Sequence, residues 1–318
     1  MTVTGRGGAR SGPEVVGTGL AVLSAGAFAT SGIFAAALIG AGWSPAAAAL
    51  ARFGGPSVLL AAPAAVQLHG RWALLRREAG RIMIYGLVAV GGGQLSYFNA
   101  IRAMPVGIAL VFEYVGLVLV VGWLWARRGR RPRRLTAVGV VTVVGGLILM
   151  VGAPGPSRIG PAGIVWGLLE AVSLATYFLL SARAGEDTLP PLVLAWSGMC
   201  VGAALFALVG VTGAMPITAR ADDVDLLHHQ VNWLIPVLEL VFVATLIAYC
   251  TGIAAARRLG AKLASLIGIV EVLFAALYAW LLLGQVLSPS QFAGGALILA
   301  GVIVVRVDEN AVATPTIG

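Results

Sequence analysis

One apolar stretch, residues 106–126, constrains the chain more than any other. It is long enough to cross a bilayer as a helix, because about twenty apolar residues suffice, and its one formal charge is Glu113. A carboxylate inside such a helix is expensive, so we expect Glu113 to face protein or a wet cavity. An arginine run follows at once and indicates the cytoplasmic side of the membrane. It consists of Arg127, Arg128, Arg130, Arg131, Arg133 and Arg134.

The composition indicates a polytopic membrane protein. Hydrophobic residues make up 59% and charged residues 11% of the 318 residues, whereas a soluble domain has about 25% charged residues. The formal net charge of +8 is explained by arginine-rich cytoplasmic loops, so we expect no nucleic-acid partner. Cys200 and Cys250 fall inside apolar segments, which favours buried thiols over a disulfide framework.

Hydropathy predicts ten membrane helices joined by short connections. They are residues 15–40, 46–66, 82–101, 106–126, 135–151, 162–182, 192–212, 233–254, 263–283 and 291–305. Residues 1–14 are expected to be a disordered cytoplasmic N-terminus with no cleavable signal peptide. The rest divides into a first five-helix repeat (15–152), a linker rich in proline and glycine (153–161), a second five-helix repeat (162–306) and a cytoplasmic tail (307–318).

The two sets of five helices repeat each other in sequence. From the third helix onward residue n matches residue n+155, as in Ala100/Ala255, Arg102/Arg257, Ala109/Ala264, Val115/Val270, Trp125/Trp280, Gly139/Gly294 and Gly146/Gly301. In the first two helices the offset is 146, as in Thr30/Thr176 and Pro45/Pro191. The matched tryptophans and the constant spacing indicate a true repeat, and the polar loop 213–232 accommodates the change of offset.

Arginine placement predicts that the second repeat is inverted, as an odd number of helices per repeat requires. With both chain ends in the cytoplasm, most of the 21 lysines and arginines fall inside, and Arg102, Arg158 and Arg220 fall outside. The loop 284–290, which matches the six-arginine loop by repeat, has no lysine or arginine. We therefore predict an all-α, multi-pass protein of the cell (plasma or inner) membrane with ten transmembrane helices in two inverted repeats. Its working site is expected between the halves, near mid-membrane.

Polar residues inside the apolar helices are the candidates for a site. Helical spacing places Glu170 with Tyr177 on one face and Gln94 with Tyr97 on another. Ser24 corresponds to Glu170 in the repeat, so the first and sixth helices carry a polar residue at equivalent positions. We therefore hypothesise a central cavity lined by the first, third, fourth, sixth, eighth and ninth helices. The candidates for substrate binding or proton handling are Glu113, Glu170, Glu271, Gln94, Tyr97, Asn99, Tyr177, Tyr249 and Glu239.

Each candidate has a structural alternative. An intramembrane Glu can be protonated and hydrogen-bonded with no role in transport, and the Gln, Asn and Tyr side chains can serve helix packing. Glu239 lies nearest to a helix end and can sit at an interface. Arg52 is expected to anchor at the headgroups or to pair with a loop group rather than to contact substrate. The glycine run 91–93 favours close packing or a hinge over a nucleotide loop.

Missing motifs argue against an enzyme. The chain has no GxxxxGK[ST] motif, so ATP does not drive it directly, and no HExxH motif. All three histidines lie in predicted loops, so we expect no catalytic set, no metal site and no cofactor. The cluster Asp222, Asp223, Asp225, His228 and His229 is predicted to be a solvated loop rather than a metal site.

From residue 17 to 305 the chain resembles the EamA family of the drug/metabolite transporter superfamily. The resemblance rests on residues 51–53 (ARF), 104–116 (MPVGIALVFEYVG) and 279–284 (AWLLLG). The second of these is similar to the LPxGxAxxxEFxGP string of threonine/homoserine-type exporters. The chain departs from the family where Leu117 and Val272 replace a usual Pro, and where Gln285 replaces a usual acidic residue.

The resemblance implies a secondary transporter that exports amino acids or similar small metabolites by alternating access. Proton coupling through Glu113, Glu170 or Glu271 is a hypothesis, motivated by the cost of a carboxyl group in an apolar helix. The expected partners are a small-molecule substrate and membrane lipids, with a homodimer left open. The alternatives are efflux of drugs or nucleotide-type metabolites and, from another class, a non-transporting scaffold or an intramembrane enzyme.

Overall fold

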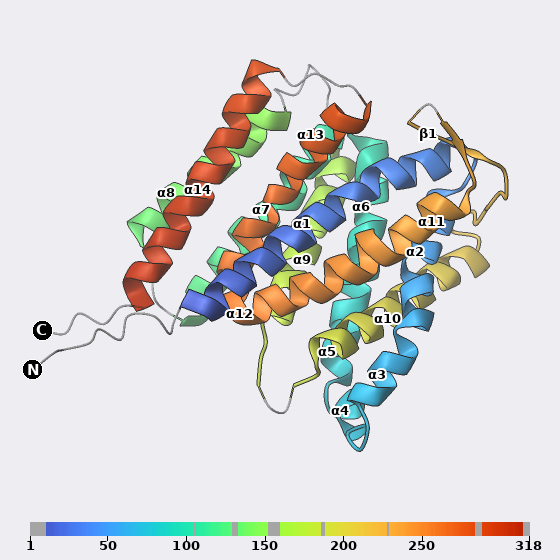
Figure 1. Cartoon of the computed structure of the whole chain (residues 1–318), viewed down its shortest axis with the longest axis horizontal. Helices are drawn as coiled ribbons and strands as arrows, with labels where there is room; N and C mark the ends of the chain where they lie inside the picture. Colours follow the sequence, from blue (N-terminus) through green and yellow to red (C-terminus); the bar gives the residue numbers. More distant parts are fainter. Residues whose placement is uncertain are drawn as a thin grey trace, which may run out of the picture.

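The computed structural model is almost entirely helical (Figure 1) and describes residues 11–104, 106–128, 133–151, 160–185, 188–227, 229–283 and 288–313. In chain order the elements are α1 (Ser11–Gly40), α2 (Pro45–Leu59), α3 (Ala61–Gln67), α4 (Ala73–Arg77), α5 (Ala79–Ile84), the π-helix η1 (Tyr85–Gly92), α6 (Gly93–Ala103), α7 (Val106–Arg128), α8 (Arg134–Val151), α9 (Pro161–Ser181), α10 (Pro191–Val211), β1 (Val224–Leu226), β2 (His229–Val231), α11 (Leu234–Val241), the π-helix η2 (Phe242–Ile247), α12 (Ala248–Gly268), α13 (Val270–Leu283) and α14 (Pro289–Ala313). The linker 153–159 and the arginines at 130 and 131 lie outside the described residues.

Each of the ten predicted segments is helical, but several differ in their bounds. The second is bent by 44° between α2 and α3. The eighth does not end at residue 254: the helix continues to a non-helical Gly260 (φ 78°, ψ 163°) and resumes at once. The prediction left residues 255–262 as a loop between the eighth and ninth helices. Arg257 instead lies in the helix and donates to the carbonyl oxygen of Leu189. The predicted ninth helix is interrupted at Ile269, where α12 gives way to α13.

The surface and the helix lengths identify a membrane protein. Within the described ranges, four helical stretches are long and apolar enough to cross a membrane: Glu14–Gly40, Pro161–Ser181, Pro191–Val211 and Leu234–Gly268. The bent pair α2–α3 makes a fifth if it counts as one span. Large apolar side chains are exposed on the outer faces, such as Val211 at 88% and Val58 at 76%. Such a surface requires a lipid environment.

The two ends of the bundle differ in charge. At one end, here called the terminal end, α1 begins and α14 finishes (Figure 1). Arginines cluster there, in α4, at the end of α7 and at the start of α8. The opposite end, here called the hairpin end, carries the antiparallel β1–β2 hairpin, which replaces part of the predicted irregular loop 213–232. Trp43 fixes that loop by donating from Nε1 to the carbonyl oxygen of Arg220 at 2.7 Å.

Helix packing follows the sequence repeat. Helix α1 packs on α12 and α13, and the repeat-related α9 packs on η1, α6 and α7. The helices α2 and α10, which are equivalent by repeat, pack on each other, as do α8 and α14. The π-helices also correspond, since residues 85–92 plus 155 cover η2. Each half therefore carries an irregular helix at the same place.

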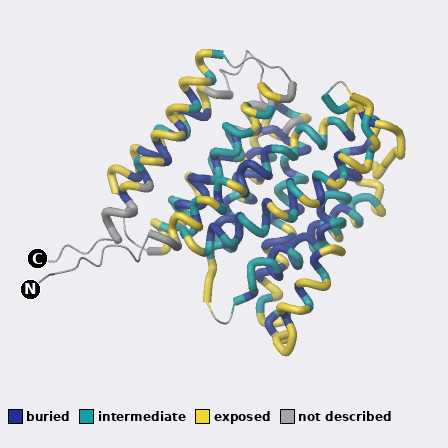
Figure 2. The backbone as a smooth tube through the Cα atoms, viewed as in Figure 1, coloured by how far each residue is buried: buried dark blue, intermediate teal, exposed yellow. Residues whose placement is uncertain are grey.

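Helices α8 and α14 meet through glycines. A Cβ built on Gly139 would lie 2.9 Å from the carbonyl oxygen of Gly301, and one built on Gly146 would lie 2.7 Å from that of Gly294. The contact order is reversed along the two helices, so they run antiparallel. In the repeat, Gly139 corresponds to Gly294 and Gly146 to Gly301, so the two contacts are equivalent. The helix pair therefore has local two-fold symmetry. Figure 2 shows buried and exposed residues alternating along α14, the helix that packs on α8.

This packing gives a first prediction. Gly146→Ala would place a methyl group against backbone atoms of α14 that cannot move aside, so we expect the free energy of unfolding to fall by about 1–3 kcal/mol. The neighbouring Gly145 has nothing within 4 Å, so Gly145→Ala should leave stability unchanged or raise it. Thermal unfolding in detergent measures both variants. Equal melting temperatures would contradict the close glycine contact.

Candidate functional site

A cavity of about 470 Å³ lies among the helices of both halves. All six helices that the sequence analysis assigned to a cavity contribute residues, and α2, which was not assigned, contributes Arg52. Seven of the nine predicted site residues line it: Gln94, Tyr97, Glu113, Glu170, Tyr177, Tyr249 and Glu271. The walls between them are apolar, which is typical of small-molecule sites with a few orienting polar groups.

Two predicted residues do not line the cavity. The amide nitrogen of Asn99 donates to the carbonyl oxygen of Leu95 at 2.8 Å, so its side chain is used within its own helix. Glu239, on α11, accepts a hydrogen bond from the Thr30 hydroxyl of α1. It therefore links two helices, and its side chain is half-buried.

Three carboxyl groups converge in the cavity from different helices. Glu113 comes from α7, Glu170 from α9 and Glu271 from α13, and Glu113 interacts electrostatically with both of the others. Glu170 is 5% exposed, and among the described residues its Oε2 has no hydrogen-bond partner. A buried carboxyl group without a partner is costly. The cluster is therefore suited to bind a cationic group or to exchange protons.

Arg52 is the main residue that the sequence analysis misassigned. Its side chain points into the bundle and contacts the third and eighth predicted helices, not the headgroups. Nη1 donates to Oε1 of Gln94 at 3.0 Å, and Nε donates to the Thr245 hydroxyl at 3.2 Å. Nη2 donates to the carbonyl oxygen of Ala244 at 3.3 Å. The cavity thus holds one guanidinium group together with three carboxyl groups.

An aromatic layer lines part of the cavity. Tyr177 packs edge-on against Tyr249 with ring centroids 5.6 Å apart and against Phe178 at 5.0 Å. Phe28 packs on Tyr249 at 5.0 Å. Gly252 is needed here, because a Cβ at this position would collide with the Tyr177 hydroxyl. The lining continues along α1 as far as Ile39, next to the last residue of that helix and near the hairpin end.

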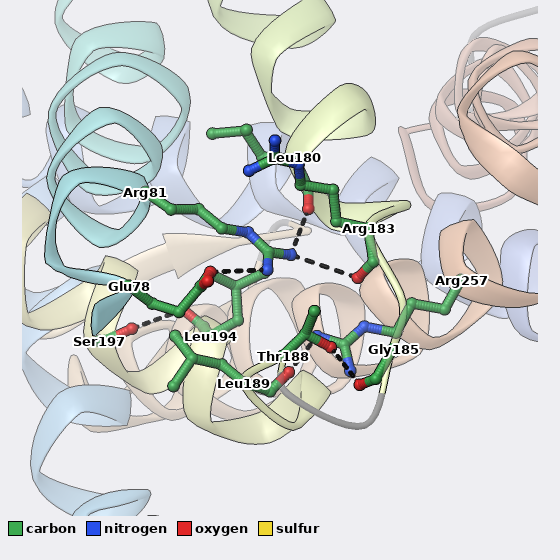
Figure 3. Close-up of polar contacts among 10 residues, drawn as sticks. All are labelled: Glu78, Arg81, Leu180, Arg183, Gly185, Thr188, Leu189, Leu194, Ser197 and Arg257. Atoms are coloured by element: carbon green, nitrogen blue, oxygen red, sulfur yellow. Dashed lines mark hydrogen bonds and ion pairs between the residues drawn. The ribbon is translucent and has the colours of Figure 1, made fainter. Parts of the chain in front are cut away.

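Two arginines, here called the arginine clasp, bind the connection between α9 and α10 (Figure 3). Tyr85 stacks on Tyr177 at 6.0 Å, and Arg81 lies one turn before Tyr85. Arg81 is 6% exposed and donates to Glu78 at 3.0 Å and to the carbonyl oxygens of Leu180 and Arg183 at 2.6 and 3.3 Å. Together with the Arg257 bond to Leu189, these contacts hold the α9–α10 connection to α5 and α12.

The structure gives no support to a metal site in the part of the chain that it describes. No group of three or more His, Cys, Asp and Glu side chains could hold an ion there. Asp225 and His229 lie in the exposed β1–β2 hairpin, and His228 is outside the described residues. Cys200 and Cys250 are free thiols and only partly buried.

Comparison with known proteins identifies the family. The model of the EamA-like transporter family matches residues 15–152 and 161–307. This chain belongs to the EamA-like transporter family. The uncharacterized inner membrane transporter YicL of Salmonella typhimurium is 27% identical over 74% of this chain and 75% of its own length. The uncharacterized transporter YwfM of Bacillus subtilis is 25% identical over 79% of this chain and 80% of its own.

Two further similarities concern the activity and the fold. The threonine/homoserine exporter RhtA of Escherichia coli (strain K12) is 28% identical to this EamA-like protein over 69% of this chain and 68% of its own. A solved structure described only as "Crystal structure of protein" has a TM-score of 0.72 at 18% identity and covers 94% of this chain and 99% of its own. The fold is therefore shared with a known structure, and the chain is a membrane transporter by family.

The arginine clasp gives a second prediction. Arg81→Gln removes a buried charged donor worth about 1.5–3 kcal/mol, so we expect the α9–α10 connection to open more often. Ser181, fully buried beside it, reports this opening after Ser181→Cys in a background without Cys200 and Cys250. In detergent, Arg81→Gln should raise the rate of thiol labelling at position 181 by about tenfold or more.

The matched control for this test is Arg76→Gln, because Arg76 is exposed on α4. It should label at the unmodified rate. If Arg81→Gln and Arg76→Gln label equally slowly, the clasp does not hold this end closed.

Proposed function

We propose that this protein is a secondary transporter that exports amino acids or related small metabolites across the cell membrane by alternating access. The observation that carries the proposal is the cavity. It lies between the two repeats and contains ionisable groups of both signs, and its lining extends along α1 to Ile39, near the hairpin end. The proposal takes the hairpin end as the open side and the terminal end as the closed side, because an alternating-access carrier is open to one side only in each of its two states.

The proposed topology is ten membrane helices in two inverted five-helix repeats. Repeat-related helices that pack antiparallel, as α8 and α14 do, support it, because inversion produces this geometry. The excess of arginines at the terminal end supports a cytoplasmic location for that end and for both chain ends. The cavity would then be open to the outside, as in an exporter that is about to release or has just released its substrate.

Amino acids are the proposed substrates for two reasons. RhtA, a relative that covers about two thirds of this chain, is named a threonine/homoserine exporter. The cavity also offers a guanidinium group and carboxyl groups, which complement the two charges of an amino acid. The second candidate is efflux of bulkier drugs, which the aromatic side chains of Phe28, Tyr97 and Phe98 in the lining favour. A scaffold has no need of such a cavity, and transporter relatives argue against an enzyme.

Glu113, Glu170 and Glu271 are the proposed proton-handling residues. Three carboxyl groups in one small apolar-walled space repel one another when ionised, so proton binding and substrate binding are expected to compete or cooperate there. Gln94, Tyr97, Tyr177 and Tyr249 would orient the substrate. The proposed partners are this substrate and membrane lipids, with no nucleic acid, and a homodimer is the alternative to a monomer.

Export from cells gives the third prediction. Cells overproducing the protein should release one class of amino acid from a panel that includes threonine and homoserine. Glu113→Gln, Glu170→Gln and Glu271→Gln should each lower the release or flatten its dependence on external pH, because a glutamine keeps the shape but cannot exchange a proton. Glu14→Gln at the exposed start of α1 is the control and should behave as the unmodified protein.

The outcomes separate the two parts of the proposal. Release that persists with unchanged pH dependence in all three variants would end the proton-coupling role of these residues but not the export function. If cells with correctly inserted protein release no amino acid, amino-acid export is overturned and efflux of bulkier drugs becomes the favoured function. Efflux of a dye from the same cells would then test that function.

A further inference from the structure

Arg52 has hydrogen-bond donors that the described residues do not use. A guanidinium group carries five N–H donors and no acceptor, and the three bonds described above use one donor on each nitrogen. One N–H therefore remains on each of the two terminal nitrogens, in a group that lines the cavity. Two such donors match the two oxygens of a carboxylate, the arrangement in which arginine binds most strongly.

The protein supplies Arg52 with neutral acceptors only. Gln94, Thr245 and the Ala244 carbonyl group carry no charge, and within the described ranges no carboxylate lies within ion-pair distance of the guanidinium group. Glu113, Glu239 and Glu271 interact with it electrostatically from other helices, but none of them lies within ion-pair distance. Arg52 is also about 10 Å along the helix from the start of α2, at 1.5 Å per residue. A charge at this depth without an ionic partner is costly and marks a functional site.

We infer that Arg52 binds the carboxylate of the substrate, and that Glu113 on α7 and Glu271 on α13, which line the same cavity, accept its ammonium group. This inference rests on the proposed function and narrows it: the cavity would select substrates that carry both charges, the α-amino acids, over amines and over simple carboxylic acids. Arg52 is then the residue that determines specificity, and the carboxyl groups alone would admit any cation.

The contacts of Arg52 also connect the substrate to both irregular helices. Ala244 and Thr245 belong to η2, and Gln94 lies two residues after the end of η1. A carboxylate on the two free donors would share the guanidinium group with η2 and with the start of α6, directly after η1, so its binding is coupled to the positions of both segments. A ligand can shift a conformational equilibrium only through such differential contacts. Arg52 thus offers a direct route from substrate binding to movement of the two halves.

The test uses three probes and the purified full-length protein. L-threonine has both charges, L-threoninamide lacks the carboxylate, and 3-hydroxybutyrate lacks the ammonium group. Binding is measured from the concentration of each probe that protects the protein against thermal unfolding in detergent. For the unmodified protein we expect L-threonine to bind about 10- to 100-fold more tightly than L-threoninamide, the range for a hydrogen-bonded charge. 3-Hydroxybutyrate should be similarly weak.

Variants at Arg52 assign this preference. Arg52→Gln should weaken L-threonine until it equals L-threoninamide, without changing L-threoninamide itself, and Arg52→Lys should keep part of the preference. Arg102→Gln, which changes an exposed arginine at the hairpin end, is the control and should keep all of it. Melting temperatures without probe show that each variant is folded, and if Arg52→Gln is not, Arg52→Lys carries the comparison.

Each outcome has one meaning. Arg52→Gln with the unmodified preference for L-threonine would overturn the assignment of Arg52 while leaving amino-acid transport intact. Unmodified protein that binds L-threonine and L-threoninamide equally would do the same without any variant. Unmodified protein that binds none of the twenty common amino acids would overturn this inference and the proposed function together.

Discussion

The structure depends on one constraint: a charged side chain within a lipid-exposed bundle must be placed where protein or an internal cavity can receive it. Arg52, Glu113, Glu170 and Glu271 all satisfy it in the same place, although they come from four different helices. The same constraint accounts for the apolar exteriors of α8, α10 and α14 and for the polar centre. The cavity gives the charged groups polar surroundings, and its charges determine which molecules it can bind.

The two-fold relation between the halves suits the proposed change in the accessibility of the site. The pairs α2–α10 and α8–α14 each consist of two helices that correspond in the repeat. They join the two halves, and glycines allow the close contact between α8 and α14. The elements that carry the site, by contrast, contain the irregular segments η1 and η2 and the break at Gly260. π-helices often occur at functional sites because they leave backbone groups free, and here the Ala244 carbonyl group of η2 receives Arg52. Rigid joints and deformable site helices are thus separated.

The sequence predicted the elements well and the contacts unevenly. The length of an apolar run and the spacing of residues along a helix are local properties of the sequence. The ten helical segments and the shared face of Glu170 and Tyr177 could therefore be predicted directly. Arg52 could not be placed, because distance along α2 does not tell which neighbour its long side chain meets. Asn99 has the right face but bonds to Leu95 within its own helix, an alternative that periodicity does not detect. The π-helices and the helical continuation past residue 254 depend on tertiary contacts such as the Arg257–Leu189 bond.

The most direct measurement is the accessibility of one cavity position from both sides of the membrane. Tyr97→Cys, in a background without Cys200 and Cys250, would be labelled with a membrane-impermeant thiol reagent in right-side-out and in inside-out vesicles. Alternating access predicts labelling from both faces, with protection by the transported amino acid in each case, while a cysteine at Val141, which is exposed at 71% in the middle of α8, stays unlabelled in both. Labelling from one face only, in vesicles that still transport, would contradict a cavity that opens alternately to the two sides.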